Sequence, residues 1–235
     1  MLSKKKDPMG QAIFDFQKSG KSKRLWVFSD ISEKDEIPVN YLFRNYNHMP
    51  VIEQQALKAC KGRILDVGAA AGSHSLWLNK KGFDVTSIDI SDLAVQTMQK
   101  RGLKKVECVD FYKITTKSKY DTILFLMNGA GIAGLLKSLP ILLKKCRKLL
   151  NEDGQILIDS SDINYMFDDE DDKPIGKYYG EVEYTISYEE CLSDTFNWLF
   201  VSFDLLKVIA NKNGFSCKQV YKGKNHDYLA KLVME

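Results

Sequence analysis

Short apolar runs alternate with stretches of helical periodicity along most of the chain. The apolar runs predict five buried strands, at residues 64–67, 83–88, 106–111, 120–127 and 154–159. Between them, the positions of capping and small residues predict helices from residue 73 onward, at 91–102 and at 139–150. Strands and helices that alternate in this way are typical of an α/β protein with a parallel sheet.

The alternation is interrupted after the fifth strand. Apolar and polar residues alternate at 182–188 and again at 196–200, which predicts an antiparallel strand pair inserted at about 163–203. A helix capped by Asp204 is expected next, followed by two last strands at 215–221 and 227–234. The main sheet is therefore expected to have seven strands.

The first sixty residues precede this pattern and are expected to form a separate extension. Asp7 and Pro8 predict the cap and first turn of a short helix. A second helix is expected from Pro50 to about Lys61. The predicted organisation is an N-terminal helical extension over residues 1–60, followed by the main domain over residues 61–235.

Composition limits the class of protein. A chain of 235 residues with 44% hydrophobic and 28% charged residues fits one α/β domain with additions. The apolar runs are too short to span a membrane, and Asp7-Pro8 follows the basic start where a secretory signal would need an apolar core. The five cysteines form no C-x-x-C pair, which favours a reducing compartment. We expect a cytoplasmic protein.

Charge adds little evidence for a large partner. The formal net charge of +3 predicts neither a nucleic-acid groove nor an acidic partner. Basic residues gather at 4–6 and 18–24, and residues 168–172 form an acidic run. Both are expected to be solvated loops.

The segment from Arg63 to Gly72 is the most informative part of the chain. Its small residues follow a buried strand and allow a tight turn before a helix, and a ligand is expected over the N-terminus of that helix. Asp89 ends the second strand, twenty-one residues after Gly68. A carboxylate in this position can accept hydrogen bonds from both hydroxyls of a ribose, so the unit predicts a nucleoside-cofactor site.

The spacing of the small residues distinguishes two classes of cofactor. A dinucleotide fingerprint that starts at Gly68 matches at only one of its three glycine positions. The pattern D/E-x-G-x-G-x-G is instead met by Asp66, Gly68, Ala70 and Gly72, with alanine in place of the middle glycine. In this segment the chain resembles the class I S-adenosylmethionine-dependent methyltransferases. The alanine implies that either the loop shifts or cofactor affinity falls.

The resemblance implies a Rossmann-like, doubly wound, mostly parallel seven-stranded sheet whose last strand is antiparallel. It implies S-adenosyl-L-methionine as cofactor, with Asp110 bonded to the adenine amine and Phe111 packed on the ring. It also implies that the N-terminal extension is a lid, in which Arg44 clamps the methionine carboxylate, although a surface ion pair is the alternative. The expected cofactor-binding residues are Tyr41, Arg44, Asp66, Gly68, Ala70, Gly72, Asp89, Ile90, Asp110, Phe111 and Asn128.

The methyl acceptor is expected to lie at the carboxyl ends of the fourth and fifth strands. Asp159 or Asp162 is a candidate base or anchor, with a loop cap as the alternative, and His74 is a candidate that a merely packed histidine would also explain. The segment 128–131 lacks the Asn/Asp-Pro-Pro-aromatic motif of methyltransferases that act on adenine or glutamine, and it lacks acidic metal ligands. A small-molecule acceptor without a metal is therefore expected, and a nucleic-acid partner is not.

Three alternatives stay open from the sequence. The chain can be a nicotinamide-dependent oxidoreductase, because the two folds share the strand, turn, helix and ribose acid. It can be a non-catalytic module that keeps the nucleoside pocket. It can also methylate protein or RNA, which a continuous basic face would support.

Overall fold

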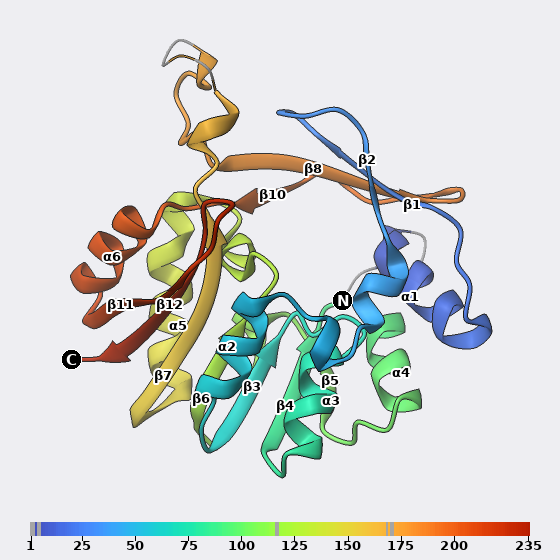
Figure 1. Cartoon of the computed structure of the whole chain (residues 1–235), viewed down its shortest axis with the longest axis horizontal. Coiled ribbons are helices and arrows are strands. Elements are labelled where there is room, and N and C mark those ends of the chain that lie inside the picture. The colour runs from blue at the N-terminus through green and yellow to red at the C-terminus, as the bar shows by residue number, and fades with distance from the viewer. Residues whose placement is uncertain (1–2, 4–5, 116–117, 168, 170–171) are drawn as a thin grey trace. The chain divides into compact units, whose positions relative to one another are not determined.

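A computed structural model describes residues 3, 6–115, 118–167, 169 and 172–235 of the chain (Figure 1). The chain divides into two compact units. The first contains residues 1–50, 63–115 and 183–196, and the second contains residues 51–62, 116–182 and 197–235. The main sheet has seven strands and is mostly parallel.

The first unit contains the strands and helices around the predicted cofactor turn. Its helices are α1 (Pro8–Ser19), α3 (Ser73–Lys80) and α4 (Asp92–Lys100), with short 3-10 helices η2 (Val39–Phe43), η3 (Tyr46–His48) and η4 (Phe111–Lys113). Its strands are β1 (Leu25–Ser29), β2 (Asp35–Ile37), β3 (Arg63–Val67), β4 (Asp84–Asp89), β5 (Val106–Cys108) and β9 (Cys191–Leu192), with most of β8 (Glu181–Tyr188).

Three strands of the main sheet lie in this unit, in the order β3, β4 and β5. Four of the five residues of β3 are buried, as expected for a parallel strand covered on both sides. β3 pairs in parallel with β4, and β4 pairs in parallel with β5. In the first pair Val67 lies beside Ile88, so the turn after β3 and the end of β4 meet at one sheet edge. This edge carries the predicted site.

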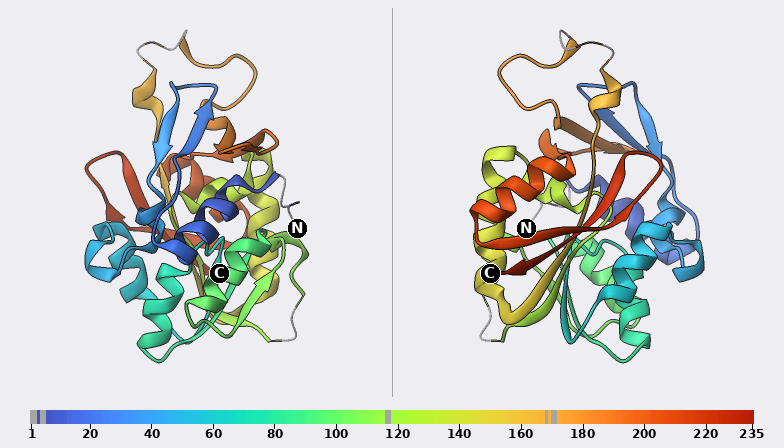
Figure 2. Two further views of the ribbon diagram at one scale, coloured as in Figure 1. Left: turned by 90° about the vertical axis from the view of Figure 1, so that its right-hand side faces the viewer. Right: turned by 60° about the vertical axis from the view of Figure 1, so that its left-hand side comes forward.

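The N-terminal helix packs on the turn that follows β3. Asp7 caps α1 by accepting a hydrogen bond from the Gly10 amide at 2.9 Å. Ile13 is fully buried in a cluster with Leu42 and Ala71, the last of which belongs to the turn. The helix also lies beside α4 (Figures 1 and 2).

The second unit contains the other strands of the main sheet. Its helices are α2 (Val51–Ala59), α5 (Leu139–Leu149) and α6 (Phe203–Lys212), with 3-10 helices η5 (Gly129–Ala133), η6 (Leu136–Ser138) and η7 (Asn164–Met166). Its strands are β6 (Tyr120–Phe125), β7 (Leu150–Ser161), β11 (Phe215–Lys222) and β12 (Asp227–Met234), together with nearly all of β10 (Phe196–Leu199).

The end of the chain closes this part of the sheet with an antiparallel strand. β6 and β7 pair in parallel, whereas β12 pairs antiparallel with both β7 and β11, as Figure 2 shows for the C-terminal hairpin. The predicted antiparallel last strand is therefore confirmed. The fold class predicted from the sequence, a Rossmann-like α/β fold, is confirmed as well.

Several local predictions differ from the structure. The N-terminal extension is not wholly helical, because β1 pairs antiparallel with both β2 and β8. Asp204 is not the cap of α6; the Ser202 hydroxyl accepts the Leu205 amide at 3.4 Å, and Asp204 lies in the first turn. The third strand ends at Cys108, three residues before its predicted end. β8, with its partner β9, and β10 lie where the inserted pair was expected.

Some predictions lie outside the described residues. The acidic run 168–172 includes residues 168, 170 and 171, and the basic start includes residues 4 and 5, none of which the structure describes. Among the residues that are described, no helix is long and apolar enough to cross a membrane.

Candidate functional site

The turn between β3 and α3 is held in a left-handed backbone conformation at three positions. Gly68, Ala70 and Gly72 have φ angles of 70°, 50° and 79°. For alanine this conformation costs on the order of 1 kcal/mol. A Cβ atom at Gly72 would lie 2.7 Å from Leu103 Cδ1 and 2.9 Å from Met98 Cγ, so only glycine lets α4 and its following turn approach this closely.

Hydrogen bonds to β4 fix the position of this turn. The amides of Gly68 and Ala69 donate to the Ile88 carbonyl at 2.9 and 3.1 Å. The Ala70 amide donates to Asp89 Oδ2 at 2.9 Å, and the Ser91 amide donates to Asp89 Oδ1 at 2.9 Å. One carboxylate therefore joins the turn after β3 to the turn after β4.

Burial raises the pKa of Asp89 to about 6, and the negative charge of nearby Asp7 contributes in the same direction. Backbone hydrogen bonds from Ser91 and Ala70 act against this rise. Each carboxylate oxygen receives one backbone N–H, and an ionised carboxylate has about four lone-pair sites. Asp89 thus keeps capacity to accept hydrogen bonds from a ligand diol.

Asp66 is tied to the protein around it. The Ser75 hydroxyl donates to Asp66 Oδ2 at 2.6 Å, and the Ser87 hydroxyl donates to Ser75 Oγ at 2.7 Å. Burial raises the pKa of Asp66, while the nearby charge of His74 acts against that rise. His74 is itself buried. The hydrogen bonds of Asp66, Ser75 and Ser87 link β3, α3 and β4, so Asp66 helps to fix the turn.

The other residues predicted to contact a nucleoside follow β4 and β5. Asp110 accepts the Tyr112 amide at 2.9 Å and so caps η4. Phe111 is buried and packs edge to face with Tyr112, with ring centroids 5.7 Å apart. Ile90, next to Asp89, is 44% exposed. Within the first unit, these residues follow the ends of β4 and β5, on the same sheet edge as the turn.

The N-terminal segment contributes Tyr41 and Arg44. The Arg44 guanidinium lies over the Tyr41 ring at 3.9 Å and donates to the Tyr41 carbonyl at 2.6 Å. Arg44 is buried, with 8% of its surface exposed. The Ser73 hydroxyl donates to the Leu42 carbonyl at 2.7 Å, which anchors this segment to the start of α3.

In the second unit, Asp159 stabilises a strained strand end. Met127 and Asn128 both have positive φ angles, 65° and 57°. Asp159 accepts the Met127 amide at 3.1 Å and the Gly129 amide at 2.8 Å. The Asn128 side chain accepts the Ser160 hydroxyl at 2.9 Å. These hydrogen bonds favour the loop-cap interpretation of Asp159 over a role as base.

Asp162 lies among aromatic side chains of the same unit. Tyr179 donates its hydroxyl to Asp162 Oδ1 at 2.7 Å, and Tyr178 packs on Tyr179 with ring centroids 4.4 Å apart. Phe167 contacts Tyr179 edge to face. Burial and the neighbouring Tyr178 and Asp162 raise the pKa of Tyr179, so the phenol stays protonated at neutral pH and acts as a donor.

The structure also brings together residues whose contact the sequence did not predict. Asp7 and Ser91 were expected only as helix caps, yet the Ser91 hydroxyl donates to Asp7 Oδ2 at 2.6 Å. Arg101 donates to the Ala71 carbonyl at 2.5 Å and was not singled out at all. Both contacts span many residues of chain, and no local pattern signals them. Across the described residues no cluster of three or more potential ligands could hold a metal ion.

Comparison with known proteins gives consistent matches. Residues 41–220 match a family model described as a methyltransferase domain. The chain is similar to an uncharacterized methyltransferase from Staphylococcus carnosus (strain TM300), with 27% identity over 184 residues, which is 78% of this chain and 83% of that protein.

Solved structures agree with this match. A SAM-dependent methyltransferase from Bacteroides fragilis, crystallised with S-adenosyl-L-homocysteine, is 44% identical with a TM-score of 0.94, over 100% of this chain and 97% of that one. A SAM-bound amino pentose methyltransferase from Micromonospora echinaspora shares the fold at 11% identity, with a TM-score of 0.59 over 87% of this chain and 100% of that one.

The raised pKa of Asp89 predicts a pH-dependent contribution to stability. A carboxyl whose pKa is higher in the folded than in the unfolded chain binds its proton more tightly when folded, so its contribution falls as pH rises from about 4 to about 6. Asp89→Asn removes this titration. We expect the free energy of unfolding of Asp89→Asn minus that of the unmodified protein, measured in urea titrations, to be larger at pH 7 than at pH 4, because only the unmodified protein loses this contribution. If the difference between the two free energies of unfolding does not change with pH, the raised pKa of Asp89 is contradicted.

Proposed function

This chain is a class I S-adenosylmethionine-dependent methyltransferase, and we propose that it transfers the methyl group to a small-molecule acceptor. The family membership excludes the nicotinamide-dependent oxidoreductase considered from the sequence. The observation that carries the site assignment is Asp89, which joins two turns and keeps acceptor capacity on both carboxylate oxygens.

The residues of the first unit fit S-adenosylmethionine. We assign the ribose hydroxyls to Asp89, the adenine to Asp110, Phe111 and Ile90, and the methionine carboxylate to Arg44, which packs on Tyr41. The turn Gly68, Ala70 and Gly72 is assigned to the backbone cradle, and Asp66 holds that cradle through Ser75. A role for Asn128 in cofactor binding stays a prediction. Its side chain accepts a hydrogen bond from the Ser160 hydroxyl and donates one to the Leu199 carbonyl.

The cofactor, when bound, supplies a methyl carbon that the adjacent sulfonium already activates. The protein must orient an acceptor nucleophile in line with that carbon and exclude water, and good alignment is worth roughly 7 to 11 kcal/mol. A general base is needed only for an acceptor that carries a proton at the working pH. Asp162 is the better candidate for base or anchor, because its bonds from the Tyr179 hydroxyl and the Asn164 amide both reach Oδ1, whereas loop amides bond to both carboxylate oxygens of Asp159.

Several features support a small acceptor and a cytoplasmic location. The net charge of +3 gives no basis for a nucleic-acid groove, and residues 128–131 lack the motif of adenine and glutamine methyltransferases. The five cysteines are free thiols. Free thiols fit a reducing compartment.

The ribose assignment predicts the effect of Asp89→Ala. Loss of charge-assisted hydrogen bonds should weaken S-adenosyl-L-homocysteine binding by about 1.5–3 kcal/mol, or roughly ten- to a hundredfold in the dissociation constant. Asp84→Ala, at the exposed beginning of the same strand, is the matched control and should leave binding unchanged. Isothermal titration calorimetry measures both, and an unaltered dissociation constant for Asp89→Ala would remove the assignment.

The acceptor class is tested with methyl-labelled cofactor. The protein is incubated with S-adenosylmethionine that carries tritium in its methyl group and with cell extract, which is then separated by size. We expect label in the small-molecule fraction, because the charge and motifs favour that class. Label in protein or RNA would contradict the proposal, and cofactor binding with no labelled product would favour the non-catalytic module.

We further propose that residues 1–60 act as a lid over the cofactor turn, since Ile13 packs against Ala71. S-adenosyl-L-homocysteine should then protect residues 1–48 from limited proteolysis. Ile13→Val costs about 0.5–1.5 kcal/mol of packing and should lessen this protection. Ile141→Val, at a 57% exposed position of α5, should not. Equal cleavage with and without ligand would refute the lid.

A further inference from the structure

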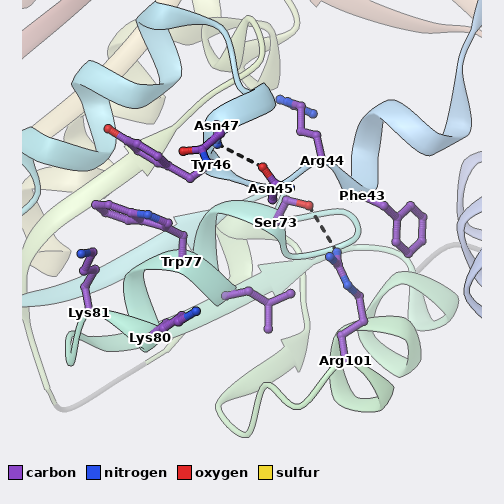
Figure 3. Close-up of a pocket in the computed structure, with 11 residues that line it drawn as sticks. Phe43, Arg44, Asn45, Tyr46, Asn47, Ser73, Trp77, Lys80, Lys81 and Arg101 are labelled. Atoms are coloured by element: carbon purple, nitrogen blue, oxygen red, sulfur yellow. Dashed lines mark hydrogen bonds between the residues drawn. The ribbon is translucent and has the colours of Figure 1, made fainter.

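A pocket of the first unit lies along one face of α3, and of its lining residues only Arg44 has a role in the function proposed above. It has a volume of about 530 Å³ and is lined by α3, the segment 43–47 and Arg101 (Figure 3). This volume suits a small ligand. None of the turn residues 66–72 lines it, nor do Asp89 and Asp110.

The lining of the pocket is strongly basic. Of the eleven lining residues, all in the described part of the chain, four are cationic and none is acidic. Lys80 and Lys81 come from the end of α3 and the residue after it, and Arg101 follows α4. A concave surface with charges of one sign concentrates ligands of the opposite sign. The pocket therefore favours an anion.

Aromatic rings form one wall of the pocket. Trp77 and Tyr46 stack on each other (Figure 3). Their ring centroids are 4.5 Å apart, and their planes make an angle of 14°. Both side chains are half-buried. The Lys81 ammonium lies 5.5 Å from the Trp77 ring centroid. A planar ring and an ammonium group in one wall match a ligand that has an aromatic part and an anionic part.

Polar groups near the stacked rings and at Arg101 add hydrogen-bond donors. Figure 3 shows Asn45 and Asn47 beside the stacked rings, and each side-chain amide can donate. Arg101 bonds to the Ala71 carbonyl and to Ser73 Oγ at 3.3 Å, so its guanidinium is held in place at the pocket. Arg44 also lines the pocket, but its guanidinium stacks on Tyr41, and the ligand assignment does not depend on it.

We propose that this pocket is a second ligand site, which binds a small planar aromatic molecule that carries a phosphate. Lys80 and Lys81 bind the phosphate, and the Trp77–Tyr46 wall packs against the ring. Lysine suits a phosphate because its ammonium acts as a compact point charge.

The test uses 1-naphthyl phosphate as the probe and neutral 1-naphthol as its uncharged control. Isothermal titration calorimetry on the full chain is done with the cofactor site saturated by S-adenosyl-L-homocysteine. We expect saturable binding of naphthyl phosphate with a dissociation constant below about 1 mM, and at least tenfold weaker binding of naphthol. Lys80→Gln/Lys81→Gln and Trp77→Leu should each weaken phosphate binding at least tenfold. Lys148→Gln, an exposed lysine of α5, is the control and should not.

Four results would overturn the proposal: no saturable binding, equal affinity for probe and naphthol, full affinity in the double lysine variant, or displacement of the probe by S-adenosyl-L-homocysteine. The last result would place the probe in the cofactor site. Circular dichroism of each variant identifies loss of folding, and the charge-preserving Lys80→Arg/Lys81→Arg variant must then retain binding. Failure of S-adenosyl-L-homocysteine to bind would instead contradict the cofactor assignment, so the two proposals fail separately.

Discussion

The site depends on one constraint: a single half-buried carboxylate must accept hydrogen bonds from two turns that follow different strands. Asp89 ends β4, and the amides of Ala70 and Ser91 converge on it. These bonds offset part of the desolvation of the acid and hold Ala70 in a conformation that alanine rarely adopts. The same carboxylate therefore holds the turn in place and keeps capacity to accept further hydrogen bonds.

The sequence predicted the parts of the fold that local patterns determine. Arg63–Val67 is apolar enough to be recognised as a buried parallel strand, and Ser91 and Asp7 are recognisable caps. The turn at Gly68 was identified because small residues and a distant acid fall at fixed spacing. Where one element and its immediate neighbours determine the structure, the sequence was therefore sufficient.

Features that depend on distant partners could not be predicted in this way. β1 is a strand because it pairs with β8, whose residues lie more than 150 positions away in the chain. Serine and aspartate are both common N-cap residues, so the sequence does not decide between Ser202 and Asp204. Ser202 is the cap because α6 begins at Phe203. The role of Asp159 depends on the strained turn at Met127 and Asn128, which the sequence does not reveal. The pocket beside Trp77 requires three separate segments to meet.

The double use of Asp7 limits how the start of the chain can be altered. Its carboxylate caps α1 through the Gly10 amide and also accepts the Ser91 hydroxyl, next to the strand end that carries Asp89. A chain trimmed to begin at Pro8 would lose a helix cap and, in the same step, the acceptor of the Ser91 hydroxyl proton, while Ser91 Oγ would still accept the Ala94 amide. Truncation or fusion at this terminus would therefore disturb the hydrogen bond between Ser91 Oγ and Asp7 Oδ2, close to the end of β4.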